Sequence, residues 1–372
     1  MIHYKKRFLA GLLAPLSVLL TLLAHRFPYF TERWFSQGLY PVFTETYGRL
    51  FGVLPFSVSQ FLVIIFPVGA LIYLIWEVWN IFIVNWKKFC LRLVANVFCT
   101  VGVLAFLFTI FAGLNYARLE FSDLIGLEIT PLPASELFEL GETLVRQANE
   151  LSTQVNRNQY NHMQLTVSNL ELARQAQTAF RAAAEYYPIL SGFVPITKPI
   201  IYSRFMSRLR ITGIYSPFTM EAHVNVHVPD YHIPATMLHE LAHFRGIMRE
   251  DEANFIAWLV GIKSGNPYFM YSGTMLALSH TLNQIRRISP YNHAVIWSQL
   301  NQNVVDDFIN NSEYWRQFTG PLADFSNNLN DAYLRANRQE DGVASYGRMV
   351  DLLLAYTRDI KNRGASPHTP LT

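Results

Sequence analysis

Cysteine and charge are both scarce in this chain. Its 372 residues include two cysteines, Cys90 and Cys99, and none after residue 99. The rest of the chain therefore has neither disulfides nor thiolate metal ligands. Charged residues make up 15% of the composition against 51% hydrophobic residues, which is apolar for a soluble protein. These shortages exclude a disulfide-stapled domain and point towards a lipid environment.

Three long apolar runs lie near the N-terminus. Residues 8–24 and 93–114 carry no charge, and residues 61–84 carry one, Glu77. Each run approaches the roughly 20 residues that a helix needs to cross a bilayer. We therefore expect a membrane anchor over residues 1–114 with three transmembrane helices and the lipid bilayer as a partner. A cleaved signal peptide is the alternative for the first run, and we interpret Glu77 as reaching the membrane interface.

The placement of basic residues predicts the topology. These residues are Lys5, Lys6 and Arg7 before the first run, and Lys87, Lys88 and Arg92 between the second and third. Cytoplasmic segments carry an excess of Lys and Arg. We therefore expect a cell-membrane protein with a cytoplasmic N-terminus and an extracytoplasmic domain after about residue 115. Residues 1–114 hold nine basic and three acidic residues, or +6, which leaves −3 for the rest of the +3 total. That balance predicts no nucleic-acid partner.

Beyond the anchor, the pattern is mainly helical. We expect a linker over 115–133, a domain over 134–363 and a disordered tail over 364–372. The helices predicted for the domain cover about 135–156, 168–187, 198–208, 234–245, 249–264, 267–287, 291–311, 313–338 and 345–361. One strand signal, with a period of two, covers 222–228. The expected fold class is therefore mainly α with a small β-sheet.

The segment His239-Glu240-Leu241-Ala242-His243 is the most informative one. Residues four apart on a helix share a face, so the two imidazoles can bind one metal ion together. Glu240 lies beside them, where it can accept a proton from a water molecule. This pattern is typical of zinc hydrolases, above all peptidases. Its helix is too short and too polar to span a membrane, which argues against an intramembrane protease.

A third metal ligand must come from outside this motif. One family of zinc peptidases has a third histidine where this chain has Arg249, which cannot ligate. The next helix opens with three acidic residues, of which Glu252 shares a face with the apolar Phe255 and Leu259. An inward carboxylate without a partner is unfavourable, so a cation would explain it. We predict Glu252 as the ligand with Glu250 as the alternative. The acidic residues could instead cap the N-terminus of their helix and complement its dipole.

Several further residues receive weaker predictions. The strand at 222–228 either pairs with an extended substrate or is a plain edge strand. We assign His223 and His227 to the surface, and His232 and His280 to structural roles. The candidates for stabilising an oxyanion are Tyr271, Tyr215 and Arg249, and the sequence does not rank them.

Seven sequence blocks resemble the DUF3810 family of bacterial membrane proteins, and the resemblance spans nearly the whole chain. They are Pro217-Phe218-Thr219, Val224-Asn225, the motif at 239–243, residues 249–255, Tyr271-Ser272-Gly273, Asp341-Gly342-Val343 and Ser345-Tyr346-Gly347. The resemblance implies a zincin-like fold in which His239 and His243 bind the metal and Glu240 acts as the base. It does not identify a substrate.

We therefore expect a membrane-anchored zinc metallopeptidase that acts outside the cytoplasm on a peptide or protein substrate, with Zn²⁺ as its cofactor. One alternative is a zincin-fold sensor or scaffold that binds metal and cleaves little. Another is a structural membrane protein with an accidental motif, which predicts no bound zinc.

Overall fold

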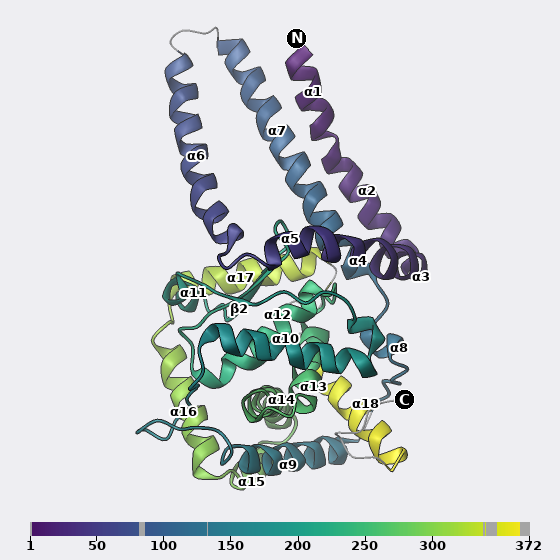
Figure 1. The fold of residues 1–372 in the computed structure, drawn as a ribbon, viewed down its shortest axis with the longest axis vertical. Coiled ribbons are helices and arrows are strands. Elements are labelled where there is room, and N and C mark those ends of the chain that lie inside the picture. The colour runs from purple at the N-terminus through teal and green to yellow at the C-terminus, as the bar shows by residue number, and fades with distance from the viewer. Residues whose placement is uncertain (1, 82–85, 132, 338, 340–347, 365–372) are drawn as a thin grey trace. The chain divides into compact units, whose positions relative to one another are not determined.

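The computed structural model describes residues 2–81, 86–131, 133–337, 339 and 348–364. It forms two compact units (Figure 1). The first comprises residues 1–118 and 216–221, and the second comprises residues 119–215 and 222–372. Helices dominate the described chain and accompany one three-stranded sheet, which confirms the expected fold class.

Three helices of the first unit are long and apolar enough to cross a membrane, which confirms the three predicted runs. The first span is formed by α1 (Ile2–Gly11) together with α2 (Leu13–Arg26), the second by α6 (Val58–Ile81) and the third by α7 (Trp86–Phe111). The third span begins at Trp86 rather than at 93, because the basic residues after Trp86 continue the helix instead of forming a link. Residues 82–84, predicted to end the second span, lie outside the described residues. Both cysteines lie in α7 and are free.

The first and third spans approach closely through glycines. A Cβ atom at Gly102 would lie 2.6 Å from the carbonyl oxygen of Ala10, and one at Gly11 would collide with the ring of Phe98. Small residues at such crossings let two helix backbones pack tightly in lipid. Any larger side chain at either glycine would separate α1 from α7.

Glu77 does not reach towards an interface as the sequence suggested. Its side chain is buried between α6 and α7, where it accepts hydrogen bonds from Tyr73 and from the guanidinium of Arg92. Asn96 in turn donates to the Tyr73 hydroxyl. The prediction was wrong because Arg92 belongs to the third span and brings a countercharge alongside the second.

The chain between the first two spans is helical. It forms α3 (Pro28–Phe30), α4 (Tyr40–Phe43) and α5 (Arg49–Gly52), joined by the wider π-helical turns η1 (Thr31–Leu39) and η2 (Thr44–Gly48). We call the whole stretch, residues 28–52, the connecting helix. The third span ends in the short 3₁₀ turn η3 (Gly113–Ala117). Asn115 and Arg118, at the start of the predicted linker, are buried rather than extended into solvent.

Residues 216–221 belong to the first unit through specific hydrogen bonds. The Glu221 carboxylate is buried and accepts from the backbone amides of Val58, at 3.1 Å, and Ser59, at 2.7 Å. A carboxylate at this position satisfies free amides at the start of α6 and complements the helix dipole. The Tyr47 hydroxyl also donates to the Phe218 carbonyl, at 2.7 Å.

The second unit is built from helices of mixed length. They are α8 (Phe121–Leu124), α9 (Ala134–Leu151), α10 (Asn169–Tyr186), α11 (Ser203–Arg208), α12 (Ile233–Phe244), α13 (Glu250–Lys263), α14 (Pro267–Ile288), α15 (Pro290–Trp297), α16 (Gln302–Arg316), α17 (Pro321–Ala336) and α18 (Arg348–Asn362), with the 3₁₀ turns η4 (Pro188–Leu190) and η5 (Asp230–His232). The predicted helix at 291–311 is divided, because Asn301 caps α16 by accepting from the amide of Val304. The resemblance blocks at 341–347 and the tail at 365–372 lie outside the described residues.

The sheet contains β1 (Lys198–Pro199), β2 (Gly213–Ser216) and β3 (Glu221–Val224) in the order β1-β3-β2. Strand β3 pairs in parallel with β1, with Lys198 opposite His223. The predicted strand at 222–228 is therefore shorter than expected and central. With neighbours on both sides it is not free to add a substrate strand, which leaves β1 and β2 as the two edge strands of the sheet.

Helix α13 lies at the centre of the second unit. Every residue from Asp251 to Ile262 is buried, and the helix packs against α10, α12, α14 and α18 (Figure 1). Its neighbour α12 is buried along most of its length as well. The two helices that carry the predicted metal ligands are therefore rigidly packed in the core of this unit.

Candidate metal centre

Helix α12 brings the two histidines of the motif together. Pro234 occupies the first turn, where its missing N–H costs nothing, and Gly246 follows the last turn with a φ of +81°. His239 and His243 lie one turn apart, with ring centroids separated by 4.6 Å. The spacing of the sequence motif is thus realised on one helical face.

The third member of the cluster comes from the first residue of α13. The Glu250 carboxylate lies 3.3 Å from Nε2 of His239 and 3.5 Å from Nε2 of His243. One donor atom from each of these three side chains falls within 4.8 Å of the other two. We call His239, His243 and Glu250 the metal cluster. Two imidazoles and a carboxylate form a donor set suited to a divalent transition metal such as zinc.

Both histidines are oriented by hydrogen bonds at their other ring nitrogen. Nδ1 of His239 donates to the Asn254 side-chain oxygen, at 2.8 Å, and Nδ1 of His243 donates to the Ile247 carbonyl, at 2.7 Å. This arrangement leaves Nε2 of each ring directed at Glu250. Such outer partners fix the tautomer and orientation of histidine ligands in metal sites.

Glu252, the predicted ligand, does not join the cluster. Its carboxylate is buried, as predicted, but it accepts from the amide of Phe121, at 2.8 Å, and from the guanidinium of Arg249, at 2.9 Å. An arginine and a backbone amide supply the partner that the sequence argument assigned to a cation. The structure brings Glu250, the sequence alternative, to the two histidines instead.

Charge coupling within the cluster shifts two pKa values. Burial alone would lower the pKa of His243, but the adjacent Glu250 carboxylate raises it to about 9. Burial alone would raise the pKa of Glu250, but His243 and His239 lower it. The cluster therefore favours a protonated His243 beside an ionised Glu250. A metal ion binding there must displace that proton.

Glu240 lies next to the cluster on α12 and is buried. A Cβ atom at Gly213 would lie 2.3 Å from Oε1 of Glu240, so only glycine on β2 lets the strand pass this close. Its other oxygen, Oε2, has no hydrogen-bond partner among the described residues. Burial raises the pKa of Glu240 to about 7. A buried acceptor of this kind suits a group that takes up and releases a proton near neutral pH.

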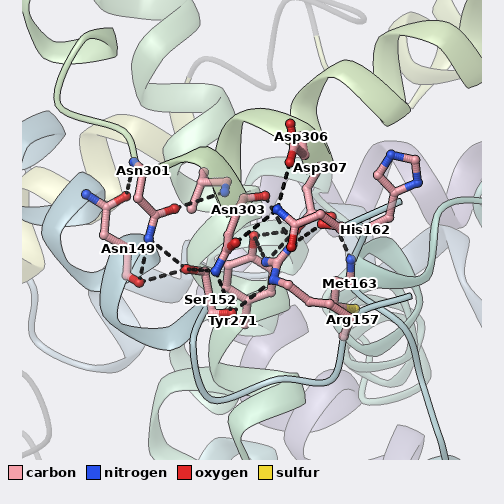
Figure 2. A network of polar contacts seen from close by, with 12 residues as sticks. Asn149, Ser152, Arg157, His162, Met163, Tyr271, Asn301, Asn303, Asp306 and Asp307 are labelled. Atoms are coloured by element: carbon pink, nitrogen blue, oxygen red, sulfur yellow. Dashed lines mark hydrogen bonds and ion pairs between the residues drawn. The ribbon is translucent and has the colours of Figure 1, made fainter. Parts of the chain in front are cut away.

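The three candidates for oxyanion stabilisation differ in their surroundings. Tyr271 is buried and donates to Asp307, at 2.6 Å, within a polar network that also contains Arg157 (Figure 2). Arg249 is occupied by Glu252. Tyr215 lies on β2 two residues after Gly213, so strand alternation puts its side chain on the face where a Cβ atom at Gly213 would meet Glu240.

The four other histidines for which the sequence predicted a role lie outside the cluster. His223 is buried in β3, where Nδ1 donates to the Ile214 carbonyl at 3.2 Å, so its assignment to the surface was wrong. His227 contacts the Tyr314 hydroxyl at 2.9 Å. Burial lowers the pKa of His232 to about 4, and Nε2 of this ring contacts Asn311 at 2.7 Å. Burial, with the charge of His239 as a second cause, lowers the pKa of His280 to about 4.

The sequence reasoning missed two features of the site. One is β2, whose close approach to Glu240 had no signal in the sequence beyond the glycine itself. The other is the contact of Asn254 with His239. The sequence places Asn254 on the helical face of Glu250, four residues on, but this spacing was not used to choose Glu250.

The fold and the cluster together define a helical protein with three candidate membrane spans and a candidate divalent-metal centre. The family model described as "Protein of unknown function (DUF3810)" matches residues 35–354, so the chain belongs to the DUF3810 family. The match includes the motif and both helices of the metal cluster. Comparisons with curated proteins and with solved structures gave no match.

Proposed function

We propose that this protein is a membrane-anchored zinc metallopeptidase with a zincin-like catalytic domain. The observation that carries the proposal is the buried Glu240 carboxylate, whose Oε2 has no hydrogen-bond partner among the described residues, beside two histidines and a glutamate whose donor atoms converge. A structural metal site does not need a buried carboxylate oxygen without a partner at this position. A hydrolytic site requires one as its general base.

Separate residues would bind the metal, orient its ligands and transfer the proton. His239, His243 and Glu250 would hold Zn²⁺, and Asn254 would keep the first imidazole in the required tautomer. When bound, zinc supplies Lewis acidity to the attacking water and to the scissile carbonyl. Oε2 of Glu240 accepts the proton of that water and returns it to the leaving amine.

Strand β2 provides a reason to choose peptides as the substrate class. It lies at the end of the sheet, and Gly213 brings its backbone directly against Glu240. An extended peptide can pair with such a strand through main-chain hydrogen bonds, independently of its side chains. The Tyr215 hydroxyl is our candidate for stabilising the oxyanion that develops on the scissile carbonyl.

The proposed topology places this chemistry outside the cytoplasm. Lys87, Lys88 and Arg92 occur at the end of the third span that faces the N-terminal basic residues. A C-terminal alkaline phosphatase fusion, which is active only outside the cytoplasm, should therefore be active. A fusion that is inactive but fully expressed would reverse the orientation.

The Glu240→Gln substitution tests the catalytic assignment. The assay should use the full-length protein in detergent, because residues 216–221 belong to the first unit, which contains the candidate membrane spans. We expect one zinc ion per chain in wild type and variant, and cleavage of casein or a quenched peptide library by the wild type alone. Loss of the general base should lower turnover by roughly 10²–10⁴-fold.

A matched control is Glu171→Gln, the same chemical change at an exposed position on α10. It should leave both zinc content and turnover unchanged. Equal activity of wild type and Glu240→Gln would remove the proposed base. Stoichiometric zinc without turnover in the wild type would favour the sensor or scaffold alternative.

A further inference from the structure

The connecting helix has its polarity inverted relative to a helix of a soluble domain. Six large apolar or aromatic residues of this stretch are exposed, with exposed polar residues such as Arg33, Gln37 and Arg49 among them; the six are Tyr29, Phe30, Trp34, Leu39, Val42 and Leu50. Its buried residues are mostly polar or small, and comprise Thr31, Glu32, Ser36, Thr44, Gly48 and Gly52 together with the aromatic Tyr40. Single exposed apolar residues are ordinary, but six large ones on one short helical stretch whose buried residues are mostly polar mark a surface that something covers.

The buried polar residues of the connecting helix form hydrogen bonds and an ion pair with residues that directly follow the third span. The Glu32 carboxylate forms a paired contact with the Arg118 guanidinium, at 2.7 and 3.0 Å, and both side chains are buried. One turn further, the Ser36 hydroxyl donates to the Asn115 side-chain oxygen at 2.9 Å. These contacts fix the rotation of the connecting helix about its axis. Its apolar face is therefore held away from the spans by specific bonds.

Chain connectivity restricts where this face can lie. The connecting helix follows the first span, which ends at Arg26, and precedes the second, which begins at Val58. Both of its ends therefore lie at the same side of the bilayer. In Figure 1, α3, α4 and α5 run across the ends of the three spans instead of continuing along them.

We propose that the connecting helix is embedded in the bilayer surface, with its apolar face in the boundary between lipid headgroups and acyl chains. Its composition fits this layer, where Trp and Tyr side chains are enriched and amphipathic helices bury an apolar face. Arg26 stacks over Phe27 and Arg33 over Trp34, each at 5.8 Å, which suits cations beside lipid phosphates.

Nitroxide labels at matched tyrosines test this placement. In a background with Cys90→Ala and Cys99→Ala, a single cysteine replaces Tyr29, which is 76% exposed on the connecting helix, or Tyr160, which is 68% exposed between α9 and α10. The full-length protein is placed in phosphatidylcholine–phosphatidylglycerol liposomes. Collision rates of each label with oxygen, which concentrates in lipid, and with a water-soluble nickel chelate are then compared.

We expect the ratio of oxygen to nickel collisions to be several-fold higher at Tyr29 than at Tyr160. A second label at Leu50, which is 60% exposed on the same helix, should behave like the one at Tyr29 and covers the case of a poorly folded variant. Water-like ratios at both connecting-helix positions would overturn the proposal. So would spin–spin broadening at Tyr29 that disappears on dilution with unlabelled protein, because that result would mean a second copy covers the face.

Discussion

The Glu250→Gln substitution should weaken zinc binding by about two orders of magnitude. Apparent binding energies of four-ligand zinc sites are about 10–16 kcal/mol, or about 3 kcal/mol per ligand, which corresponds to roughly 100-fold in Kd. Gln keeps the shape of the side chain but removes the charge that lies 3.3 and 3.5 Å from the two imidazoles. The effect should therefore appear in metal affinity while the fold is retained.

The assay is competition for Zn²⁺ between a chelator of known affinity and the full-length protein in detergent. The matched control is Glu252→Gln, two residues away on the same helix. It should leave zinc affinity unchanged, because its carboxylate binds Phe121 and Arg249 instead of the cluster. It should lower the free energy of unfolding, by about 1.5–3 kcal/mol for a weakened charged hydrogen bond.

The reverse ranking would refute the geometric argument. If Glu252→Gln lost zinc and Glu250→Gln retained it, the ligand set would be the one predicted from the helical face. Equal losses in both variants, with lowered Tm, would mean that the start of α13 had unfolded. A thermal melt of each zinc-free variant separates that outcome from a lost ligand.

Three further predictions concern the surroundings of the cluster. Asn254→Ala should weaken zinc binding about 10–100-fold in the same competition assay, because His239 loses the partner that orients it. Gly213→Ala should lower peptide turnover with zinc content unchanged, because its methyl group would displace the Glu240 carboxylate. The pKa of His243 is raised to about 9 by its carboxylate neighbour, so zinc-free protein should lose stability as pH rises from about 6.5 through 9, by at most about 3 kcal/mol, in thermal melts with chelator present. Zinc affinity should show the opposite trend and increase over the same range, because the ligand must be deprotonated.

The choice between Glu250 and Glu252 shows where sequence periodicity fails. The argument for Glu252 assumed that α13 has one apolar face directed inwards. The structure buries α13 on every side from Asp251 to Ile262, so the apolar residues do not select a face. By contrast, the pairing of His239 with His243 depends only on the helical repeat and could be predicted. In a helix buried on every side, the four-residue spacing of the polar Glu250 and Asn254 was the sequence feature that marked the side facing the two histidines.

The length of each helix or strand explains which other parts of the fold could be predicted from the sequence. The three spans are long and uniform, so composition alone predicted them. Strands β1 and β2 contain two and four residues, too few for a period of two to be recognised. They exist because β3 pairs with them, which depends on contacts distant in sequence. The break between α15 and α16 depends on one capping residue, Asn301, within an otherwise helical pattern.

The polar network around Asp307 and the Glu240 carboxylate are both buried in the second unit, but only the network is satisfied by its own hydrogen bonds. In the network of Arg157, Tyr271 and Asp307, the charged groups bond to one another, and Asp307 also accepts from the amide of Met163 (Figure 2). Its members satisfy each other, and the network fixes the chain after α9 against α14 and α16. Such a network accounts for its own burial through hydrogen bonding.

Hydrogen bonding does not explain the burial of Glu240 in the same way. The rise of its pKa to about 7 means that keeping this carboxylate ionised inside the protein costs roughly 3 kcal/mol above neutral pH. An apolar residue of similar size would avoid that cost, as replacements of buried charges often do. No bond among the described residues compensates for the open Oε2 atom. Burying the Glu240 carboxylate is therefore unfavourable for folding. The proposed function explains this burial, because Oε2 would accept and release a proton during the reaction at the adjoining cluster.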